Sequence, residues 1–411
     1  MADQPLLNTY GRLPIIFDHG QGPWLFDIEG RRYFDTFSGI AVSGLGHSHP
    51  AVTKAIQVQS EKLLHCSNLF HTAIQHKLAQ ELCSYSGMDG VFLANSGAEA
   101  NEAAIKLARL YGHGRGIDAP AIVVMERSFH GRTLATLTAT GNRKVHAGFE
   151  PLVSGFIRVP FNDIGALEAV ASSNRNVVAV LLEPVLGEGG LILADEQWLR
   201  DVRKLCDQQH WLMMLDEVQT GNGRSGQLFA YQHFGILPDI VTTAKGLGNG
   251  FPIGACLARG KAAHLFKPGH HGSTFGGNAL ACAAALAVLD TLHSEHLMQR
   301  ARDLGTRIVA QLEKAFSGVD YVKAIRGLGL MIGIEMTSEC PELVPLAKTQ
   351  GLLLNVTSER VIRLLPALTL TDAEADFMVE RVVRIIKLYA GDDRQRPRTP
   401  PPPEGRRGTS H

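Results

Sequence analysis

The hydrophobic pattern in the middle of the chain alternates between helical spacing and short continuous apolar runs. Apolar residues recur at helical spacing in 51–64 and 73–86, and a continuous run follows at 90–94. Runs of this length are typical of strands buried on both faces. Similar runs occur at 121–126, 156–159, 177–182, 211–215, 240–244 and 253–258, with helices predicted at 95–111, 164–171 and 196–209. This alternation predicts a mostly parallel sheet covered by helices.

The pattern changes on both sides of this region. Helices are predicted at 278–292, 297–316, 343–349 and 372–388, and short strands at 322–326, 331–336, 352–355 and 361–364. Residues 24–35 indicate a β-hairpin that turns at Glu29-Gly30. We therefore predict an α/β fold with a large domain (51–294) and a smaller α+β domain (295–390) that the N-terminal segment 1–50 completes. The tail 391–411 is rich in proline and arginine and is predicted to be disordered.

Composition and charge narrow the range of partners. The chain has 411 residues, of which 45% are hydrophobic and 19% charged, an ordinary balance for a globular protein. Its formal net charge is zero, so we expect neither nucleic acid nor an anionic membrane as partner. No apolar run is long enough to span a bilayer and the N-terminus lacks the pattern of a signal peptide, so we expect a cytoplasmic protein.

The sequence predicts no metal site. Six cysteines are scattered without a Cys-x-x-Cys pair, which disfavours both a zinc site and a disulfide framework. His47 and His49 share a glycine-punctuated loop, but no third ligand is evident nearby. We interpret them as caps of this loop and of the helix that follows Pro50.

Two strand ends carry the strongest chemical signal. The run 211–215 ends in Asp216, and the next strand ends in Lys245, which Gly246 and Gly248 follow. Ligands bind beyond the carboxyl ends of parallel strands, so these residues suggest a pocket for a cationic heterocycle and a carbonyl. A lysine can condense with an aldehyde, and a carboxylate can keep a ring nitrogen protonated. A lone lysine is ordinarily a solvated charge, but this one follows an apolar strand.

Two turns rich in small residues could bind phosphate. Ser96-Gly97-Ala98 opens a helix after the strand 90–94, where free amides and the helix dipole favour an anion. A capped helix without a ligand explains this turn equally well, and the turn matches neither the nucleotide P-loop nor the dinucleotide glycine pattern. Ser273-Thr274 forms a second turn of this kind before a helix.

Aromatic and charged side chains follow other strands. Phe129 could stack on a flat ring and Arg132 could bind a carboxylate, although core packing and a surface charge are the simpler interpretations of each alone. Glu183 and Glu188 share a loop rich in proline and glycine and could orient cationic groups. Arg363 stands in a short apolar strand, where it needs an anionic partner, either a structural acid or a substrate carboxylate.

In this combination and order, the motifs resemble those of the class III aminotransferases, which use pyridoxal 5′-phosphate (PLP). The resemblance covers about residues 8–388 and rests on seven motifs: Asn95–Glu102, Phe129–Arg132, Glu183–Gly190, Asp216–Gly221, Lys245, Ser273-Thr274 and Arg363. It implies the fold type I of PLP-dependent transferases and a homodimer with shared active sites. Within the family, the chain is most similar to enzymes that act on N2-acetylornithine.

The resemblance implies a cofactor-binding role for each matching residue. Lys245 would bind PLP covalently and move a proton, and Asp216 would pair with the pyridine nitrogen. Val218 and Phe129 would pack on the two faces of the ring, and Gln219 would bond its hydroxyl group. The phosphate would be held by Ser96, Gly97 and Ala98 of one subunit and by Thr274 of the partner subunit.

The resemblance also implies residues that bind substrate. Arg132 and Ser273 would contact the amino acid, and Arg363 would bind the α-carboxylate of glutamate. Glu188 would pair with Arg363 when glutamate is absent, so that one pocket accepts first an ω-amine and then 2-oxoglutarate. Ile40 stands where ornithine aminotransferases share a tyrosine, which favours an acylated ornithine, although 4-aminobutyrate aminotransferases also have isoleucine here.

The implied reaction moves the δ-amino group of N2-acetylornithine to 2-oxoglutarate. Succinylornithine and succinyl-diaminopimelate are alternative donors, and ornithine and 4-aminobutyrate are less favoured. Asn249, Phe275 and Ala279 replace the glycine, tyrosine and proline usual in the family, which leaves the choice of substrate open. A mutase, racemase or decarboxylase of the same fold is disfavoured by two carboxylate-binding arginines. A regulatory protein is disfavoured by Lys245 and by the lack of a DNA-binding module.

Overall fold

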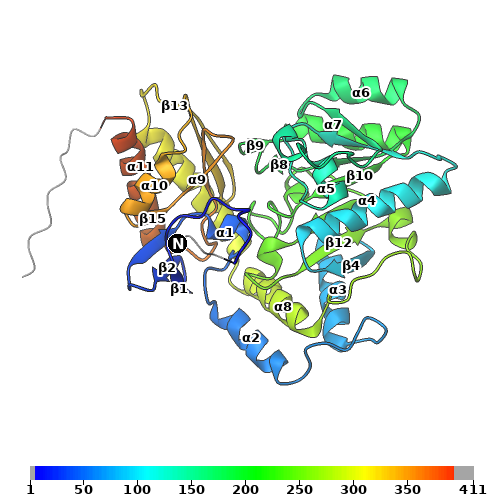
Figure 1. The fold of residues 1–411 in the computed structure, drawn as a ribbon, viewed down its shortest axis with the longest axis horizontal. Coiled ribbons are helices and arrows are strands. Elements are labelled where there is room, and N and C mark those ends of the chain that lie inside the picture. The colour runs from blue at the N-terminus through cyan, green and yellow to red at the C-terminus, as the bar shows by residue number, and fades with distance from the viewer. Residues whose placement is uncertain (1–4, 393–411) are drawn as a thin grey trace, which may run out of the picture.

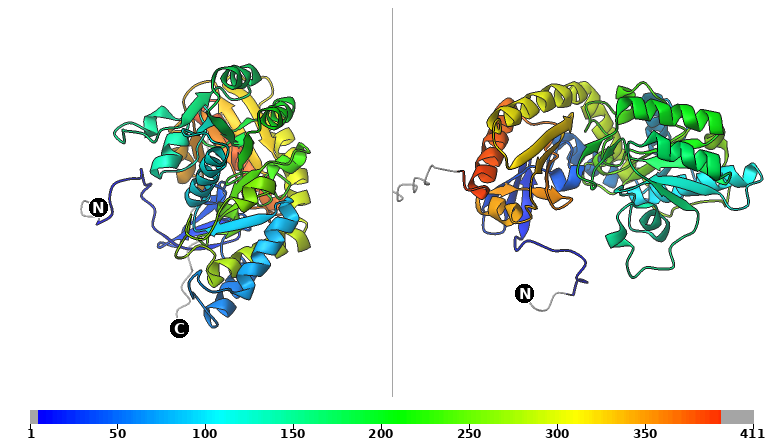
Figure 2. Two further views of the ribbon diagram at one scale, coloured as in Figure 1. Left: turned by 90° about the vertical axis from the view of Figure 1, so that its right-hand side faces the viewer. Right: turned by 90° about the horizontal axis from the view of Figure 1, so that it is seen from above.

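The computed structural model describes residues 5–392 and shows a larger and a smaller lobe (Figure 1). All but two residues of the tail predicted to be disordered lie outside this described range. The larger lobe holds the middle of the chain, and the smaller lobe combines the N-terminal strands with the C-terminal part. The chain passes from the larger to the smaller lobe between two helices, α8 (Ala279–Ser294) and α9 (Leu297–Ala315) (Figure 2).

A seven-stranded sheet forms the centre of the larger lobe. Its strands, in spatial order, are β4 (Gly90–Ala94), β12 (Gly254–Ala258), β11 (Ile240–Thr243), β10 (Leu212–Asp216), β7 (Val177–Leu182), β5 (Ala121–Met125) and β6 (Phe156–Val159). β12 runs antiparallel to both of its neighbours, and the other neighbouring pairs are parallel. The predicted mostly parallel sheet is therefore confirmed, and β12 is its one reversed strand.

Helices cover both faces of this sheet. Met213 and Leu215 of β10 belong to a buried cluster shared with α3 (Ala73–Ser86), α7 (Glu196–Gln209) and α8, whereas Leu212 and Met214 face the cluster formed by α4 (Gly97–Gly114). This alternation follows from the two-residue period of a strand. α2 (Pro50–Ser60) packs on α8, and α6 (Ile164–Ser173) packs on α7.

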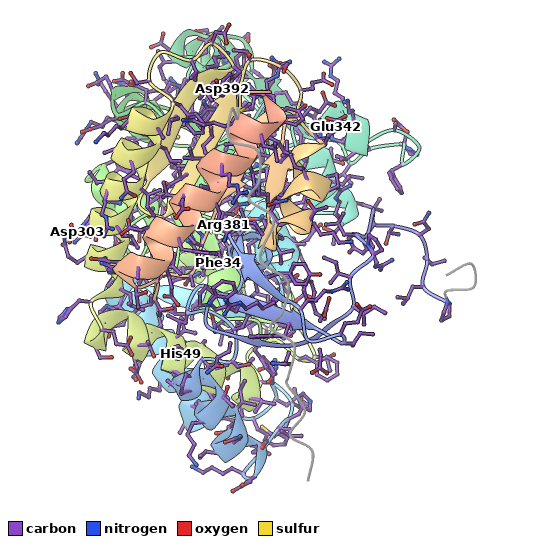
Figure 3. All side chains as sticks on the ribbon, turned by 90° about the vertical axis from the view of Figure 1, so that its left-hand side faces the viewer. Phe34, His49, Asp303, Glu342, Arg381 and Asp392 are labelled. Carbon is purple, nitrogen blue, oxygen red and sulfur yellow. The ribbon has the colours of Figure 1, made fainter. Side chains whose placement is uncertain are left out.

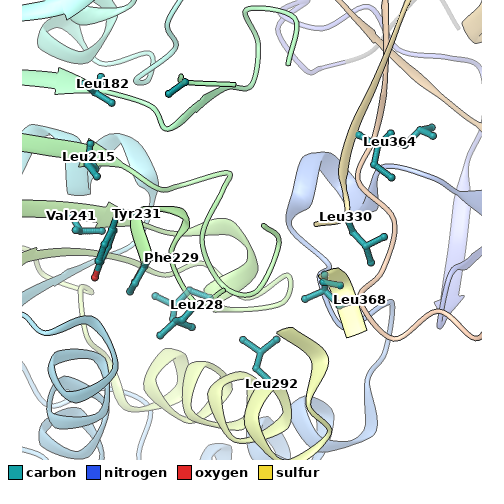
Figure 4. Close-up of a cluster of buried hydrophobic side chains, with 14 of the residues drawn as sticks. Leu182, Leu215, Leu228, Phe229, Tyr231, Val241, Leu292, Leu330, Leu364 and Leu368 are labelled. Atoms are coloured by element: carbon teal, nitrogen blue, oxygen red, sulfur yellow. The ribbon is translucent and has the colours of Figure 1, made fainter. Parts of the chain in front are cut away.

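The larger cluster continues into the smaller lobe. Leu215 and Val241 of the sheet, Phe229 and Tyr231 of the loop after β10, and Leu292, Leu330, Leu364 and Leu368 are all buried in it (Figure 4). The two lobes therefore share one hydrophobic core, which fixes their relative position at the carboxyl ends of the central strands.

Two four-stranded sheets form the smaller lobe. The first contains β1 (Phe17–Gln21), β2 (Trp24–Asp27), β3 (Arg32–Asp35) and β15 (Leu352–Leu353), and the second contains β13 (Val322–Leu328), β14 (Met331–Met336), β17 (Val361–Leu364) and β16 (Asn355–Thr357). The parallel pairing of β15 with β3 joins the N-terminal and C-terminal parts of the chain. On the outer side, α11 (Asp372–Tyr389) lies between α9 and α10 (Leu343–Thr349) (Figure 3).

Four elements illustrate where the structure differs from the sequence-based prediction. The helix expected at 51–64 ends at Ser60, and the strand expected at 352–355 is divided between the two small sheets. β1 was not predicted because its residues are mostly exposed, so it lacks an apolar alternation. α5 (Leu134–Ala139) was not predicted either, being a short helix that a capping box between Thr133 and Thr136 supports. Within residues 5–392, no helix is long and apolar enough to cross a membrane.

Candidate active site

A cavity of about 380 Å³ opens at the carboxyl ends of β10 and β11, where the sequence predicts a pocket. Asp216 is the last residue of β10 and lies beside Thr242 of β11, and Lys245 follows β11 after Ala244. Nine predicted site residues line the cavity together: Ser96, Gly97, Ala98, Phe129, Arg132, Asp216, Val218, Gln219 and Lys245. The parallel strands therefore bring the predicted acid and lysine to one site.

Asp216 is held by two side chains that were not singled out in the sequence. Asn101 Nδ2 and His130 Nδ1 both lie 2.8 Å from Asp216 Oδ2, and the amide of Val218 donates to Oδ1 at 3.0 Å. Asn101 is itself fixed by the hydroxyl of Thr242, which donates to Asn101 Oδ1 at 2.6 Å. The carboxylate is therefore buried but satisfied, and its direction is set by residues from three elements. Asn101 lies within the motif Asn95–Glu102 and His130 within the motif Phe129–Arg132, and this was the only sign in the sequence that they belong to the site.

Lys245 occupies an unusual backbone position. Its φ is 44°, in the left-handed region that non-glycine residues seldom adopt, and it begins a short 3₁₀ turn, η3 (Lys245–Leu247). Burial lowers the pKa of its amine and the nearby Arg363 adds to this effect, whereas Glu188, Asp216 and Glu183 oppose it. A lowered pKa favours the neutral amine, which is the nucleophilic form.

The N-terminus of α4 forms one wall of the cavity. Ser96 is its N-cap, whose Oγ accepts from the amide of Glu99 at 3.2 Å, so that its hydroxyl hydrogen is available to a ligand. The amides of Gly97 and Ala98 precede the first intrahelical bond, from Ala100 N to Ser96 O at 3.1 Å. Free amides at the positive end of a helix favour an anion.

Glu183 has a structural role that differs from the predicted one. Its carboxylate accepts from the amides of Phe129 at 2.8 Å and Gly187 at 3.0 Å, rather than orienting a cation. Burial raises its pKa to about 7, and the nearby His130 opposes the shift. Glu183 thus fixes the backbone beneath Phe129 and the start of the loop that carries Glu188.

Arg363 and Glu188 form an ion pair between the two lobes. Arg363, in β17, is 1% exposed, and its Nη1 lies 2.5 Å from Glu188 Oε1 and 3.2 Å from Gln219 Oε1. Its other donors, Nε and Nη2, bind Asn355 Oδ1 at 2.9 and 2.6 Å. Burial raises the pKa of Glu188, but the charge and hydrogen bond of Arg363 lower it by more. The net effect is a lowered pKa, so the carboxylate is ionised. The sequence predicted either a structural acid or a substrate carboxylate as the partner of Arg363, and in the structure a structural acid, Glu188, pairs with it.

The backbone of the Glu188 loop is bound on both sides. The carbonyl of Glu188 accepts from the hydroxyls of Thr357 at 2.6 Å and Ser358 at 3.1 Å in the smaller lobe. The next carbonyl, of Gly189, accepts from Arg127 Nη2 of the larger lobe at 2.6 Å. This loop therefore has a defined position although it contains several glycines.

Five predicted residues do not line the Lys245 cavity of this chain: Glu188 and Arg363, which pair beside it, and Ser273, Thr274 and Ile40. Ser273 lies one residue away from it, with Oγ accepting from Asn95 Nδ2 at 3.1 Å. Thr274 lines a separate small recess beside Phe70. Ile40 packs against Ala41 and its neighbours in a turn where residues 38–41 all have positive φ. This left-handed turn was not predicted, and it places Val42 rather than Ile40 on the cavity wall.

The two loop histidines differ from each other. His47 Nε2 lies 2.9 Å from Asp35 Oδ2, which ties the loop to β3. His49 is the N-cap of α2, but its side chain makes no capping hydrogen bond, so the predicted cap is wrong for this residue. Among residues 5–392, no three histidine, cysteine or acidic side chains are grouped as a metal site requires.

Comparison with known proteins gives a consistent result. The profile of the family described as "Aminotransferase class-III" matches residues 7–386. The acetylornithine aminotransferase of Nitrosomonas europaea is 55% identical over 93% of this chain and 98% of its own length. Among solved structures, an ornithine aminotransferase from Toxoplasma gondii has a TM-score of 0.91 at 33% identity, covering 95% of this chain and 94% of that one. An acetylornithine aminotransferase from Elizabethkingia anophelis has a TM-score of 0.83 at 36% identity, covering 92% and 95%.

Proposed function

This chain belongs to the class III aminotransferases, and we propose that it moves the δ-amino group of N2-acetylornithine to 2-oxoglutarate. The products are N-acetylglutamate 5-semialdehyde and glutamate. The observation that carries the proposal is the Arg363–Glu188 pair beside the Lys245 cavity. An ω-amine has no carboxylate next to its amino group, so it suits an Arg363 that Glu188 neutralises. A 2-oxo acid needs the same arginine free.

PLP is the cofactor of this family, and the residues of the cavity fit it. Gly97 lies so close to Val218 that a Cβ at this position would be 2.8 Å from Val218 Cγ1. Because Gly97 has no side chain, the two amides at the N-terminus of α4 are open to a phosphate. Asp216 offers a fixed carboxylate to a ring nitrogen, and the buried His130 Nε2 has no hydrogen-bond partner within residues 5–392. When bound, PLP carries the amino group between donor and acceptor and withdraws electrons from the substrate carbon.

We propose the following roles for the residues around the cofactor. Lys245 Nζ holds it and moves the proton at the substrate carbon, because it is the amine of the cavity whose pKa burial lowers. Asp216 keeps the ring nitrogen protonated, with its direction set by Asn101 and His130. Val218 and Phe129 pack on the ring, and Gln219 bonds its hydroxyl. The phosphate is held by Ser96, Gly97 and Ala98 of one subunit and by Thr274 of the partner subunit.

We propose that Arg132 binds the α-carboxylate of the amino donor. Its guanidinium lies over the ring of Phe129, 5.6 Å from the centroid, and it makes no hydrogen bond within the described part of the chain. A positioned guanidinium without a carboxylate partner is suited to bidentate binding of one. Arg363 then binds the α-carboxylate of 2-oxoglutarate, and Ser273 and Ile40 contribute to the outer part of the substrate site.

A homodimer is the proposed assembly. Thr274 lines a recess on the surface, and the side chains of Leu69, Phe70 and Phe275 in the same region are 87%, 66% and 61% exposed. An exposed apolar patch of this kind is typical of a protein interface. We further propose a cytoplasmic enzyme with a large domain at 51–294 and a small domain at 295–390 that residues 1–50 complete, an arrangement supported by the pairing of β15 with β3.

The test combines cofactor binding with product analysis. The protein incubated with PLP is expected to absorb in the visible range and to form glutamate from N2-acetylornithine and 2-oxoglutarate. Lys245→Ala should lose turnover, whereas the surface variant Lys261→Ala should keep it. A wild-type protein that stays colourless with PLP, or that forms product without any 2-oxo acid, would contradict the proposal.

A further inference from the structure

A second cavity, of about 530 Å³, adjoins the first. Phe129 and Arg132 line both cavities, so the two spaces meet at these two residues. Val145 and Val356 supply apolar walls from the larger and the smaller lobe. The volume lies within the range of small-molecule sites, roughly 300–1,000 Å³. A donor whose α-carboxylate binds Arg132 would therefore extend its N-acyl group into this second cavity.

Cations predominate on the walls of this cavity. Arg127, Arg132, Arg143 and Lys144 line it, against the two carboxylates of Glu188 and Glu359. Both carboxylates are engaged, Glu188 by Arg363 at 2.5 Å and Glu359 by Lys144 at 2.7 Å. The cations that remain without a carboxylate partner in residues 5–392 are Arg127, Arg132 and Arg143.

These three arginines differ in what their guanidinium groups contact. Arg127 Nη2 donates to the carbonyl of Gly189 at 2.6 Å, so it is part of the loop that carries Glu188. Arg132 is the proposed partner of the α-carboxylate. The side chain of Arg143 makes no hydrogen bond or ion pair with any residue that the structure describes. Arg143 is thus an unassigned cation on the wall of a cavity that already has one carboxylate site.

The backbone that carries Arg143 is fixed. Arg143 begins a 3₁₀ turn, η1 (Arg143–Val145), where Asn142 Oδ1 accepts from the amide of Lys144 at 3.0 Å. Gly141 precedes the turn and its amide donates to Ser128 O at 2.9 Å, and the buried His146 follows the turn. His146 Nε2 lies 2.9 Å from both Leu137 O and Thr140 O. Because the backbone of this turn is anchored, Arg143 loses only side-chain freedom when it binds an anion.

We propose that the second cavity binds the N-acyl group of the amino donor and that Arg143 is the counter-ion of a carboxylate at the end of that group. Dicarboxylic acyl groups such as succinyl are then preferred over acetyl. The inference rests on the proposed function, because it assumes that the α-carboxylate of the donor binds Arg132. An acetyl group ends in a methyl and would leave Arg143 without a partner, whereas a succinyl group ends in the anion that Arg143 lacks.

The experiment compares two donors, N2-succinylornithine and N2-acetylornithine, with the PLP-loaded wild type and with Arg143→Gln and Arg143→Lys. The wild type is expected to have the higher kcat/KM for the succinyl donor. Arg143→Gln should lower the ratio of succinyl to acetyl kcat/KM up to about fivefold, mainly through KM, since an ion pair with an exposed arginine is worth up to about 1 kcal/mol. Arg143→Lys keeps the charge and should recover part of the ratio. The surface variant Arg175→Gln should leave it unchanged.

The outcomes separate this inference from the function on which it rests. A wild type that converts both donors with equal kcat/KM, or an Arg143→Gln variant that lowers both values by the same factor, would overturn the role of Arg143 and leave the aminotransferase intact. A wild type that converts neither donor would refute the proposed function itself. Increasing ionic strength should reduce the succinyl preference, because Arg143 is exposed and its attraction is screened by salt.

Discussion

Nη1 of Arg363, on a strand of the smaller lobe, lies 2.5 Å from Oε1 of Glu188, on a loop of the larger lobe. The arginine is almost fully buried, and its remaining donors bind the amide oxygen of Asn355, so Glu188 supplies the negative charge that it needs. One contact therefore decides whether the site presents a neutral pair or a free cation.

Replacing Glu188 with glutamine should affect the two substrates of the reaction differently. The amide cannot neutralise Arg363, so a donor with an uncharged region near its reacting amine meets a buried positive charge that has lost its counter-ion. We expect kcat/KM for N2-acetylornithine to fall roughly tenfold, while that for 2-oxoglutarate stays the same or rises. Separate kinetics of the two half-reactions measure the difference.

Glu359→Gln is the matched control for this change. Glu359 lines the neighbouring cavity and pairs with Lys144 at 2.7 Å, but it forms no ion pair with Arg363 within residues 5–392 and is solvent-exposed. It should change both half-reactions little, because an exposed ion pair is weak. Equal losses of donor and acceptor efficiency in Glu188→Gln would contradict the role of Glu188.

His130 should influence the cofactor through Asp216. His130→Phe keeps a ring of similar size but removes the donor that lies 2.8 Å from Asp216 Oδ2. We expect kcat to fall roughly tenfold and the visible absorbance of the PLP-loaded protein to change its dependence on pH, since the carboxylate is then less firmly oriented.

His146→Phe is a control with the same chemical change. His146 is also buried, but its ring nitrogen contacts the carbonyls of Leu137 and Thr140 and does not reach Asp216. Both variants should lose thermal stability, so only the absorbance and its pH dependence distinguish them. An unchanged absorbance in His130→Phe would show that Asn101 alone suffices to orient Asp216.

The sequence predicted the position of the site because strand direction is a local property. Asp216 and Lys245 each end an apolar run, and parallel strands bring such ends together without further information. The partners of Asp216 were not predicted, since Asn101 and His130 are 115 and 86 residues away from it and meet it only after folding.

Backbone conformations that the local sequence does not favour were also not predicted. Residues 38–41 adopt four consecutive positive φ angles, which the sequence Ser-Gly-Ile-Ala does not favour. Asp35 stabilises the start of this turn by accepting from the amides of Phe37 at 3.0 Å and Ser38 at 2.8 Å. These hydrogen bonds are local, but Asp35 is itself held from outside the turn by His47 Nε2 at 2.9 Å. The turn places Val42 rather than Ile40 on the cavity wall.

Glu217 should make the folded protein less stable as the pH rises. It is fully buried, accepts from the amides of Ala230 and Tyr231 at 2.9 Å each, and burial raises its pKa from 4.5 to about 7. Between these two values the folded protein keeps a proton that the unfolded chain has released, so the free energy of unfolding falls with increasing pH. The loss amounts to about 3 kcal/mol over this window.

Thermal unfolding of the apoprotein between pH 5 and pH 8 tests this statement. Glu217→Gln removes the ionisation, so its Tm should fall less steeply with pH than that of the wild type, even though the variant is less stable at pH 5. Some slope should remain from Glu183, whose pKa burial also raises to about 7. Glu335→Gln is the control, because the pKa of Glu335 is lowered and it stays ionised in both states over this range. Parallel curves for wild type and Glu217→Gln would refute the prediction.

The two ends of α4 offer a direct test of the phosphate cradle. A methyl group at Gly97 would lie 2.8 and 2.9 Å from the two Cγ atoms of Val218, whereas one at Gly114 would meet nothing within 4 Å. Gly97→Ala must therefore displace either Val218 or the N-terminus of the helix, both of which line the cavity. We expect it to weaken PLP binding by roughly tenfold or more.

Gly114→Ala adds the same methyl group to the same helix and should leave the dissociation constant of PLP unchanged. Titration of the apoprotein with PLP, followed by absorbance, measures both constants, and the Tm of each apoprotein shows whether the fold is intact. Equal affinities of the two variants would mean that Val218 yields without loss and that the close approach at Gly97 is not required. A selective loss in Gly97→Ala would place the phosphate at this helix end, because the methyl group changes no charge and no hydrogen-bonding group.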